Sequence, residues 1–408
     1  MTPGSLRCPF CGTSIDVQES PVTAWAGTDL RWGVLGCECC AYPVIDGIPL
    51  VLANDDAREA LRLLEAGHRD EALAACLGLD ASRAAAFRAL AGRGDATYRE
   101  MLAVLSPDAE GTYFLYRFSD PTFVMTETLL RAVARTPGAF DGPVLDVCGG
   151  SGHLTRVLAS LTTGPVYLAD VFFWKLWLAR AFTVPGAHVV CCDANQPLPF
   201  ARAAFSAVML SDAFPYIWQR RMLADELMRA VRPDGVLLMP HLHSALGFNY
   251  AQGMALTPTA YADLFAPMAP RLFSDTALFD QAISGGSLDL ATHAAPDALA
   301  DDASISLVAS ARTDVFSRRD IALPAQPAGA LRLNPLYAVA TTADGFVCTL
   351  TFPTEEYADE FAAVRRYLPD SWTTPVDVRG AVDPTAFGSS LDELRRRRIL
   401  VDVPARYC

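Results

Sequence analysis

The sequence predicts an α/β fold built on a parallel sheet with helices on both faces. The first observation is an apolar stretch, 143–147, followed by a glycine-rich turn, 148–152, and by apolar residues at i, i+3, i+4 and i+7 from Leu154. This order is typical of a buried strand, a tight turn and a helix. The second observation is that strand-like and helical segments alternate from there to about residue 244, as in parallel sheets.

The turn Cys148-Gly149-Gly150-Ser151-Gly152 has the composition of a nucleotide-type site. Glycine lets the backbone turn sharply, and it lets a ligand approach where a Cβ would otherwise stand. A dinucleotide fingerprint starting at Gly150 would need glycine or alanine at position 155, where the chain has Thr155. The turn therefore favours another nucleotide-type ligand, although an ordinary α/β crossover can also be rich in glycine.

Acidic residues follow the next strands of the expected sheet. Segments 166–169, 188–192 and 205–210 end at Asp170, Asp193 and Ser211-Asp212, and a fifth strand, 236–239, follows the turn 232–235. Ligands bind at the carboxyl ends of parallel strands, and carboxylates accept hydrogen bonds from paired hydroxyl or amine donors. These acids therefore predict a ligand site at one edge of the sheet.

Residues 141–244 resemble the class I S-adenosylmethionine-dependent methyltransferases. In that family an acid at the end of the first strand precedes x-G-x-G-x-G; here the acid is Asp146, Gly150 and Gly152 match, and Cys148 replaces the first glycine. The resemblance implies a Rossmann-like core that binds S-adenosylmethionine. It also implies that Asp170 holds the ribose hydroxyls and that Asp193 takes the adenine amino group.

The segment 112–136 precedes this core and begins with aromatic residues. In the family such a segment often covers the methionine end of the cofactor, which Tyr113, Tyr116 and Arg117 could contact; the alternative is that the aromatic side chains belong to the core. The residues predicted to bind the cofactor are Asp146, Cys148, Gly149, Gly150, Gly152, His153, Asp170, Val171, Asp193, Ala194, Ser211, Asp212, Tyr116 and Arg117.

Two histidines, His241 and His243, follow the fifth strand. Alternation along an extended segment predicts that both point to the same side, toward the site. They are the candidate catalytic residues, since an unperturbed imidazole titrates near neutrality and can act as a general base. Metal binding and a purely structural role remain alternatives.

The N-terminal segment contains two cysteine pairs, Cys8-Pro-Phe-Cys11 and Cys37-Glu-Cys39-Cys40, separated by 25 residues. Two such pairs suit tetrahedral zinc, so we expect a closed structural site of Cys8, Cys11, Cys37 and Cys40, with Cys39 as a spare thiol. With the motif 42–49, the segment resembles the zinc-ribbon activator subunits that partner methyltransferases. The resemblance implies a ribbon that packs on the methyltransferase, here fused in cis.

The chain divides into four expected regions: a zinc ribbon, 1–52; a helical connector, 53–110; a class I methyltransferase domain, 111–300; and a C-terminal α+β module, 301–408. In the last region we expect a strand at 304–309, a hairpin of 336–341 and 346–352 around Asp344-Gly345, and helices at 355–368 and 389–398. No motif of this module carries recognisable chemistry. The fold class is therefore α/β, a Rossmann-like methyltransferase core with an added ribbon and an α+β module.

The composition limits the classes of binding partner that we expect for this protein. The net charge of −13 disfavours a general nucleic-acid binder, which needs a basic face. The most apolar stretch, 166–184, carries Asp170, Lys175 and Arg180, so no membrane span is expected. Eleven cysteines, several in apolar contexts, favour a reducing cytoplasm. A homo-oligomer is left open.

The sequence thus predicts methyl transfer from S-adenosylmethionine to an oxygen, nitrogen or carbon atom of a small-molecule acceptor, in specialised metabolism. One alternative is methylation of tRNA or of a translation factor, which the activator-like ribbon suggests. Another is a scaffold that binds the cofactor without methyl transfer. Chemistry that uses the sulfonium without transferring the methyl group is not separated from these by the sequence.

Overall fold

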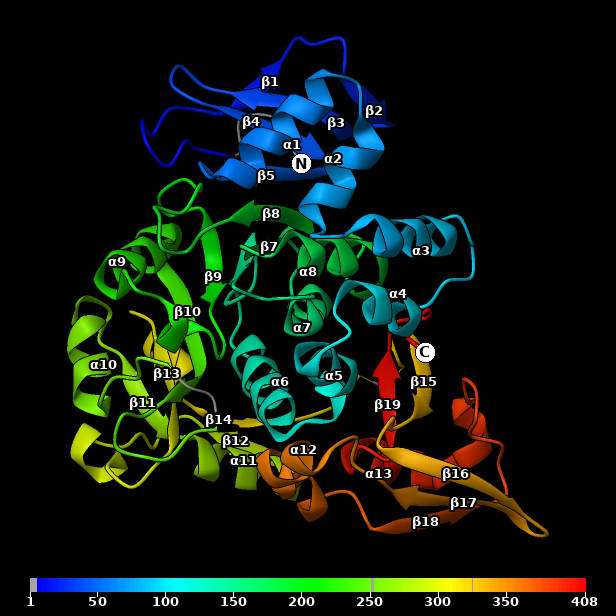
Figure 1. The fold of residues 1–408 in the computed structure, drawn as a ribbon. Coiled ribbons are helices and arrows are strands. Elements are labelled where there is room, and N and C mark those ends of the chain that lie inside the picture. Colours follow the sequence, from blue (N-terminus) through cyan, green and yellow to red (C-terminus); the bar gives the residue numbers. More distant parts are fainter. Residues whose placement is uncertain (1–5, 251–252, 325) are drawn as a thin grey trace.

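The computed structural model describes residues 6–250, 253–324 and 326–408, so residues 1–5 of the expected ribbon lie outside the described part. One large mixed sheet runs through the described protein (Figure 1). Its twelve strands are β1 (Asp16–Gln18), β2 (Ala24–Ala26), β3 (Asp29–Gly36), β4 (Ala41–Ile45), β5 (Ile48–Val51), β6 (Val144–Val147), β7 (Val166–Asp170), β8 (His188–Cys192), β9 (Phe205–Met209), β10 (Val231–His243), β11 (Arg271–Ser274) and β13 (Ser304–Ala309).

The strand order is β1-β3-β4-β5-β8-β7-β6-β9-β10-β13-β11, with β2 paired to β3. From β5 to β10 the neighbours are parallel. Strands β6, β7, β8 and β9 are almost wholly buried, which explains why they appear in the sequence as continuous apolar runs rather than as alternating ones. The parallel sheet expected from the sequence is therefore present.

Helices cover both faces of the parallel strands. Figure 1 shows α9 and α10 on one side of them and α6 and α7 on the other. The α-helices are α1 (Asp55–Glu65), α2 (Arg69–Cys76), α3 (Ala81–Ala91), α4 (Tyr98–Leu105), α5 (Ala109–Tyr116), α6 (Pro121–Ala134), α7 (His153–Leu161), α8 (Phe173–Leu178), α9 (Arg220–Ala230), α10 (Pro258–Leu264), α11 (Asp275–Ser284), α12 (Glu355–Glu360) and α13 (Leu391–Arg396).

Alternation along each strand divides the core in two. Val144 of β6 packs with Leu129 of α6 and Val157 of α7 in one core, whereas the next residue, Leu145, packs with Leu223 of α9 in the other. Successive side chains of a strand point to opposite faces, so one buried strand serves both cores. This arrangement fixes the carboxyl ends of the strands as the exposed edge where a ligand can bind.

The strand Ser304–Ala309 corrects one expectation. We predicted it in the C-terminal module, but it is β13 of the main sheet and lies antiparallel between β10 and β11. The sequence showed the strand but not its partners, because pairing across 31 to 72 residues leaves no local signal. The large sheet therefore extends beyond residue 300, where we had expected the domain to end.

The ribbon is joined to the core by a strand pair. β5 lies parallel to β8, with Leu50 opposite Cys191 and Val51 opposite Cys192, so the ribbon strands prolong the core sheet. Trp177 Nε1 also donates to Asp46 Oδ2 across this junction at 2.9 Å. A continuous sheet covers the otherwise open edge of β8, which would present unpaired backbone groups to solvent.

The C-terminal module contains the expected hairpin, whose strands are β16 (Tyr337–Thr342) and β17 (Gly345–Leu350). Its helices are shorter than predicted: α12 ends at Glu360 before a 3-10 turn at Ala362–Arg366, and α13 begins after one at Pro384–Ser390. The remaining strands outside the large sheet are β12 (Ser287–Asp289), β14 (Arg318–Asp320), β15 (Ala330–Leu333), β18 (Ser371–Thr374) and β19 (Leu400–Val403).

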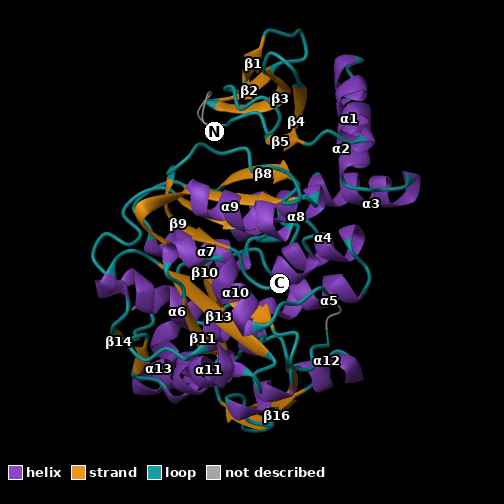
Figure 2. Ribbon diagram, turned by 90° about the vertical axis from the view of Figure 1, so that its left-hand side faces the viewer, coloured by secondary structure: helices purple, strands orange, loops and turns teal. Residues whose placement is uncertain are grey.

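The chain returns to the core at its C-terminal end. The backbone N–H of Tyr98, at the start of α4, donates to the carbonyl of Arg406 at 2.8 Å, and the C-terminus lies beside α4 in Figure 1. Figure 2 shows α4, α5 and α12 along one side of the molecule, although 238 residues separate the end of α5 from the start of α12 by the bounds given above. No helix among the described residues is long and apolar enough to cross a membrane.

Candidate active site

A cavity of about 740 Å³ lies at the carboxyl ends of β6, β7, β8 and β9. Three separate parts of the chain close it: the α5 region, the loops that follow the four strands, and Glu360 at the end of α12. Its lining includes the side chains or backbone of Glu110, Tyr113, Phe114, Arg117, Asp146, Cys148, Gly149, Gly150, Asp170, Phe172, Lys175, Asp193, Asp212, Tyr216 and Glu360.

The glycine turn leaves no room for side chains. An added Cβ on Gly149 would lie 2.5 Å from the carboxylate of Asp146 and from Leu168, and one on Gly150 would lie 2.9 Å from the ring of Phe114. Gly150 has φ 58°, and so has Cys148, which takes the left-handed conformation that glycine adopts more easily. The cysteine thus keeps the backbone shape of the turn at some cost in strain.

Asp146 is fully buried behind this turn. Thr155 Oγ1 donates to its Oδ2 at 2.7 Å, whereas Oδ1 has no hydrogen-bond partner among the described residues. Burial raises the pKa of the carboxyl group to about 7. A buried acceptor left unpaired at a cavity wall is expensive unless a ligand supplies the donor.

Asp170 is held in place by the backbone. The N–H of Gly150 donates to Oδ2 and the N–H of Phe172 donates to Oδ1, both at 2.9 Å. Burial raises the pKa of this carboxyl, and the nearby charge of Lys175 opposes that rise. The remaining lone pairs of both oxygens are available to two adjacent hydroxyl donors.

Asp193 lies at the end of β8, and its Oδ1 accepts from the N–H of Asn195 at 2.8 Å. Asp193 and the neighbouring Ala194 both line the cavity. An acid beside a free backbone amide can pair with the edge of a heterocycle that carries both a donor and an acceptor. Together with Asp170 and the glycine turn, it suits a nucleoside.

Lys175, the only lysine of the chain, was not among the predicted site residues. Its Nζ lies 2.6 Å from Glu110 Oε1 and 4.2 Å from the centroid of the Phe172 ring. The signal that could have found it was a cation in an otherwise apolar stretch, since a buried cation needs partners. Both Lys175 and Glu110 line the cavity.

The other end of the cavity has an aromatic and acidic lining. Arg117 forms a buried ion pair with Asp120 at 2.6 Å, and its guanidinium lies 5.2 Å from the centroid of the Tyr113 ring. Glu360 enters from α12. Burial raises the pKa of Glu360, as does the nearby charge of Asp212. Tyr113 was expected as a possible contact of the cofactor, whereas Glu360 was not predicted and had no sequence signal.

The two histidines lie behind Asp212. His243 Nε2 is 3.1 Å from Asp212 Oδ1, and His241 Nδ1 is 2.8 Å from Asp275 Oδ2. Asp212 lines the cavity, whereas neither histidine does. Burial opposes the positive charge of His241, but Asp212 and Asp275 outweigh it and raise its pKa to about 8.

The simple alternation predicted for the end of β10 is broken. The register with β13 shifts between Met239 and Leu242, and His241 has φ 58° inside that bulge. Asp212 is also left-handed, with φ 61°. A bulge re-aims a side chain, and the two imidazoles meet nearly at right angles, 5.3 Å apart between ring centroids. Strained backbone on two adjoining strand ends marks this as a functional region.

The structure therefore gathers most of the predicted cofactor residues in one place. Gly152 and Tyr116 are the exceptions. Gly152 instead starts α7 with φ 81°, and Tyr116 packs on Tyr357 of the C-terminal module. His153 lines the cavity but is fixed from behind, because its Nε2 lies 2.7 Å from the Tyr407 hydroxyl.

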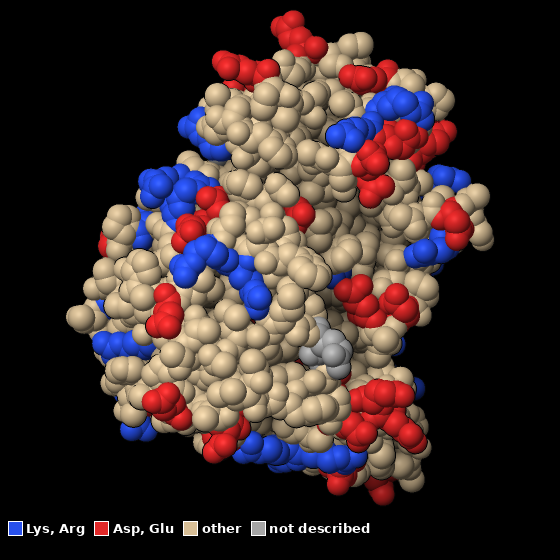
Figure 3. All heavy atoms as spheres, turned by 60° about the vertical axis from the view of Figure 1, so that its left-hand side comes forward, with Lys and Arg blue, Asp and Glu red and all other residues tan. Residues whose placement is uncertain are grey.

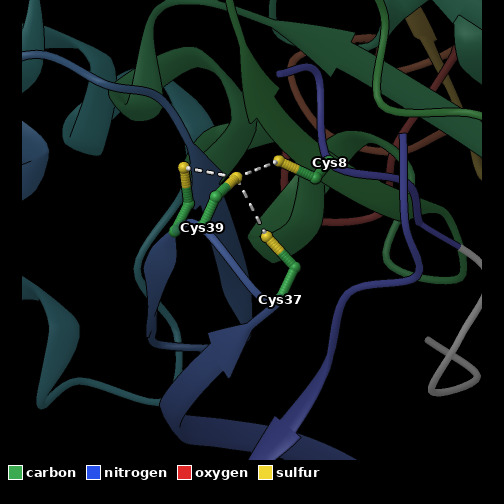
Figure 4. Close-up of side chains that lie close together, drawn as sticks. Cys8, Cys37 and Cys39 are labelled. Carbon is green, nitrogen blue, oxygen red and sulfur yellow. Dashed lines mark hydrogen bonds between the residues drawn. The ribbon is translucent and has the colours of Figure 1, made fainter. Parts of the chain in front are cut away.

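The N-terminal thiols form a second cluster, outside this cavity. Cys8, Cys37, Cys39 and Cys40 each offer a sulfur within 4.8 Å of the others. Figure 4 shows the Cys39 sulfur between those of Cys8 and Cys37, 3.6 Å from each. Cys11, a predicted ligand, has its sulfur 3.7 Å from that of Cys37. The set fits tetrahedral zinc, with Cys11 and Cys39 competing for one position.

One part of the chain matches a known protein family. Residues 144–235, from β6 into β10, match the family model described as a methyltransferase domain. A search of curated proteins finds no match.

Solved structures with some likeness include three methyltransferases. A chain of the complex between the Haloferax volcanii Trm112 methyltransferase activator and a methyltransferase is 16% identical, with 50% of this chain and 97% of that chain covered and a TM-score of 0.37. A Bacillus halodurans methyltransferase is 16% identical, with 45% and 99% covered and a TM-score of 0.32. Haemonchus contortus phosphoethanolamine N-methyltransferase 2, solved with S-adenosyl-L-methionine, is 16% identical, with 53% and 60% covered and a TM-score of 0.36.

Proposed function

We propose that this chain, whose residues 144–235 match a methyltransferase domain, transfers the methyl group of S-adenosylmethionine to a small-molecule acceptor of specialised metabolism. The observation that carries the proposal is the two-ended cavity. One end has the glycine turn with the three fixed acids Asp146, Asp170 and Asp193, and the other end has an aromatic and acidic wall. The first end suits the cofactor and the second suits the acceptor.

The residues at the first end fit S-adenosylmethionine. Asp170 is oriented to accept hydrogen bonds from the two ribose hydroxyls, and Asp193 with the amide of Ala194 is placed for the adenine edge. The buried carboxyl of Asp146 lies beside the glycine turn at this end of the cavity. When bound, the cofactor supplies an electrophilic methyl group on its sulfonium.

At the second end the chain orients the acceptor and takes up its proton. Tyr113, Tyr216 and Glu360 form walls that align the attacking atom with the methyl group, which accounts for much of the rate in such transfers. Asp212, backed by His243 at 3.1 Å, can accept the proton that the acceptor loses as the new bond forms. The histidine base expected from the sequence thus becomes a carboxylate–imidazole pair.

The size of the site favours a small acceptor. Its volume of about 740 Å³ lies within the range of roughly 300–1,000 Å³ usual for small-ligand sites. Basic and acidic groups are interspersed over the face drawn in Figure 3, whereas a nucleic-acid substrate needs a continuous basic surface. Both features argue against the alternative of a tRNA substrate.

The proposal is tested by calorimetry with S-adenosylhomocysteine, followed by a screen of acceptors with labelled S-adenosylmethionine. We expect one binding site per chain and transfer of label to small hydroxyl- or amine-bearing compounds. Label transferred to crude tRNA instead would overturn the acceptor class. A folded chain that binds no S-adenosylhomocysteine would overturn the function.

We propose also that the thiol cluster holds one structural zinc ion in a closed site. Metal analysis of protein purified under reducing conditions should give about one zinc per chain. Cys37→Ser should release the zinc and destabilise the ribbon, because metal binding supplies folding free energy to such small units. Cys348→Ser, at a buried thiol in β17, is the matched control and should keep the metal. Full zinc in Cys37→Ser would rule this site out.

A further inference from the structure

Asp212, His241 and His243 form a second cluster of metal-ligating side chains. One atom of each lies within 4.8 Å of the others. His243 Nε2 and Asp212 Oδ1 are 3.1 Å apart. Two ligand atoms about 2.1 Å from a metal ion and at right angles to each other are separated by about 3.0 Å. This pair is therefore spaced for adjacent positions around one ion without any rearrangement of the backbone.

A second layer of groups orients the cluster. Asp275 is buried, and its Oδ2 lies 2.8 Å from His241 Nδ1, while its Oδ1 accepts from Ser306 Oγ at 2.6 Å. Because both oxygens of Asp275 are occupied, it fixes the tautomer of His241 and leaves Nε2 as the free ligand atom. The Tyr261 hydroxyl donates to the carbonyl of His243 at 3.0 Å and holds that backbone. Carboxylate–histidine pairs of this kind typically stand behind metal ligands.

The donor set selects the kind of ion. Two imidazoles and one carboxylate suit divalent first-row transition metals such as Mn²⁺, Fe²⁺ or Zn²⁺, whereas Mg²⁺ and Ca²⁺ prefer oxygen ligands throughout. Three protein ligands leave positions open for other molecules. Of the three ligands, Asp212 lines the cavity, so an ion held by it lies next to the acceptor end.

We propose that Asp212, His241 and His243 bind one divalent transition-metal ion, so that Asp212 acts as a ligand rather than as the base, and that the open positions of the ion take a hydroxyl oxygen of the acceptor. A metal-bound hydroxyl loses its proton more readily, here to solvent water, and becomes a better nucleophile; as its oxygen bonds to the methyl carbon, the carbon–sulfur bond breaks and S-adenosylhomocysteine leaves. The acceptor part of this inference, an O-methylated compound, depends on the proposed methyl transfer. The proposal that these three residues bind a metal ion does not depend on methyl transfer.

The test uses the full chain, prepared under reducing conditions with its zinc content measured, and titrated with Mn²⁺ while free Mn²⁺ is followed by electron paramagnetic resonance. Mn²⁺ prefers nitrogen and oxygen ligands, so the thiol cluster does not compete for it. We expect one Mn²⁺ per chain, with spin-echo modulation from two imidazole nitrogens in the wild-type protein. That second readout needs no variant and holds even if a variant misfolds.

Variants locate the site. His243→Ala should lower the Mn²⁺ affinity by at least about tenfold, and Asp275→Ala, which removes only a positioning residue, by about 10–100-fold. His293→Ala, at an exposed histidine elsewhere, is the matched control and should bind Mn²⁺ as the wild-type protein does.

Parallel calorimetry with S-adenosylhomocysteine separates the two proposals. Cofactor binding without any Mn²⁺ binding, or Mn²⁺ binding unchanged in a folded His241→Ala/His243→Ala double variant, would overturn the metal site alone. Mn²⁺ binding without cofactor binding would leave the metal site standing and overturn the proposed methyl transfer.

Discussion

The two ends of the cavity are built in different ways. At the cofactor end, Asp146, Asp170 and Asp193 each end a strand, and neighbouring backbone N–H groups or a hydroxyl fix each of them. At the acceptor end, Tyr113, Asp212 and Glu360 come from segments far apart in the chain, and side-chain contacts rather than backbone groups hold Tyr113 and Asp212. The first end is thus a rigid product of local sequence, whereas the second depends on how distant parts pack.

This difference predicts that changes at the cofactor end act on folding and cofactor affinity together, while changes at the acceptor end act on the acceptor alone. A rigid site transmits a small displacement to every group bonded to it. A wall formed by a single side chain passes little of such a displacement on to the rest of the site.

The largest effect is expected from Gly149→Ala. The new Cβ would lie 2.5 Å from the Asp146 carboxylate and from Leu168, both buried, so the turn must move. We expect S-adenosylhomocysteine binding to be abolished and the melting temperature to fall. Gly186→Ala, where nothing lies within 4 Å of an added Cβ, is the control and should behave as wild type. Cofactor binding that survives in Gly149→Ala would show that the turn is not rigid.

Asp170→Ala comes next. It removes the proposed acceptor of the two ribose hydroxyls and frees the N–H groups of Gly150 and Phe172. Loss of charged hydrogen bonds costs about 1.5–3 kcal/mol, so calorimetry should show S-adenosylhomocysteine bound roughly 10–150-fold more weakly. Asp301→Ala, an exposed acid, should leave the affinity as it is. Unchanged affinity in Asp170→Ala would remove this acid from the cofactor site.

A pH effect follows from Asp146, whose pKa burial raises to about 7 from an ordinary value of 3.8. The folded state then holds the proton more tightly than the unfolded state, so this contribution to stability is complete below pH 4 and is lost as pH rises to 7. The variant Asp146→Asn does not lose stability in this way, because an asparagine side chain does not ionise. The free energy of unfolding of the variant relative to wild type should therefore rise between pH 4 and pH 7, by on the order of a few kcal/mol.

Denaturant titrations of both proteins across this pH range measure the difference, in which the titration of all other groups cancels. A difference that stays flat with pH would mean that the Asp146 carboxyl is ionised in the fold at pH 5. The acid would then need a cationic partner in the folded protein.

The smallest effect is expected from Glu360→Gln, which removes a charge from an exposed side chain at the acceptor end. The KM for the acceptor should change by a few-fold to about tenfold while cofactor affinity stays constant, because Glu360 contacts the acceptor end only. Glu356→Gln, on the outer part of the same helix, should change neither. A loss of cofactor affinity in Glu360→Gln would break the contrast between the two ends.

The sequence by itself determined the cofactor end. A glycine turn after a buried strand, and acids directly after the next strands, are local patterns, and parallel topology brings such strand ends to one edge. Lys175 and Phe114 were missed there, because their place in the cavity wall depends on how α5 packs against α8. The cysteine pairs could be predicted equally well from the sequence, because a short loop between two thiols is a local feature.

Only the tertiary structure decided the acceptor end. The bulge at His241 and the pairing of Ser304–Ala309 with β10 set where both histidines point. Neither feature produces a pattern in the local sequence. Asp275 reaches His241 from 34 residues away, and Glu360 reaches the cavity from a module with no motif of its own. The physical reason is that contacts between distant segments are selected by the packing of the whole chain, whereas sequence patterns report only what neighbours on one strand or helix require.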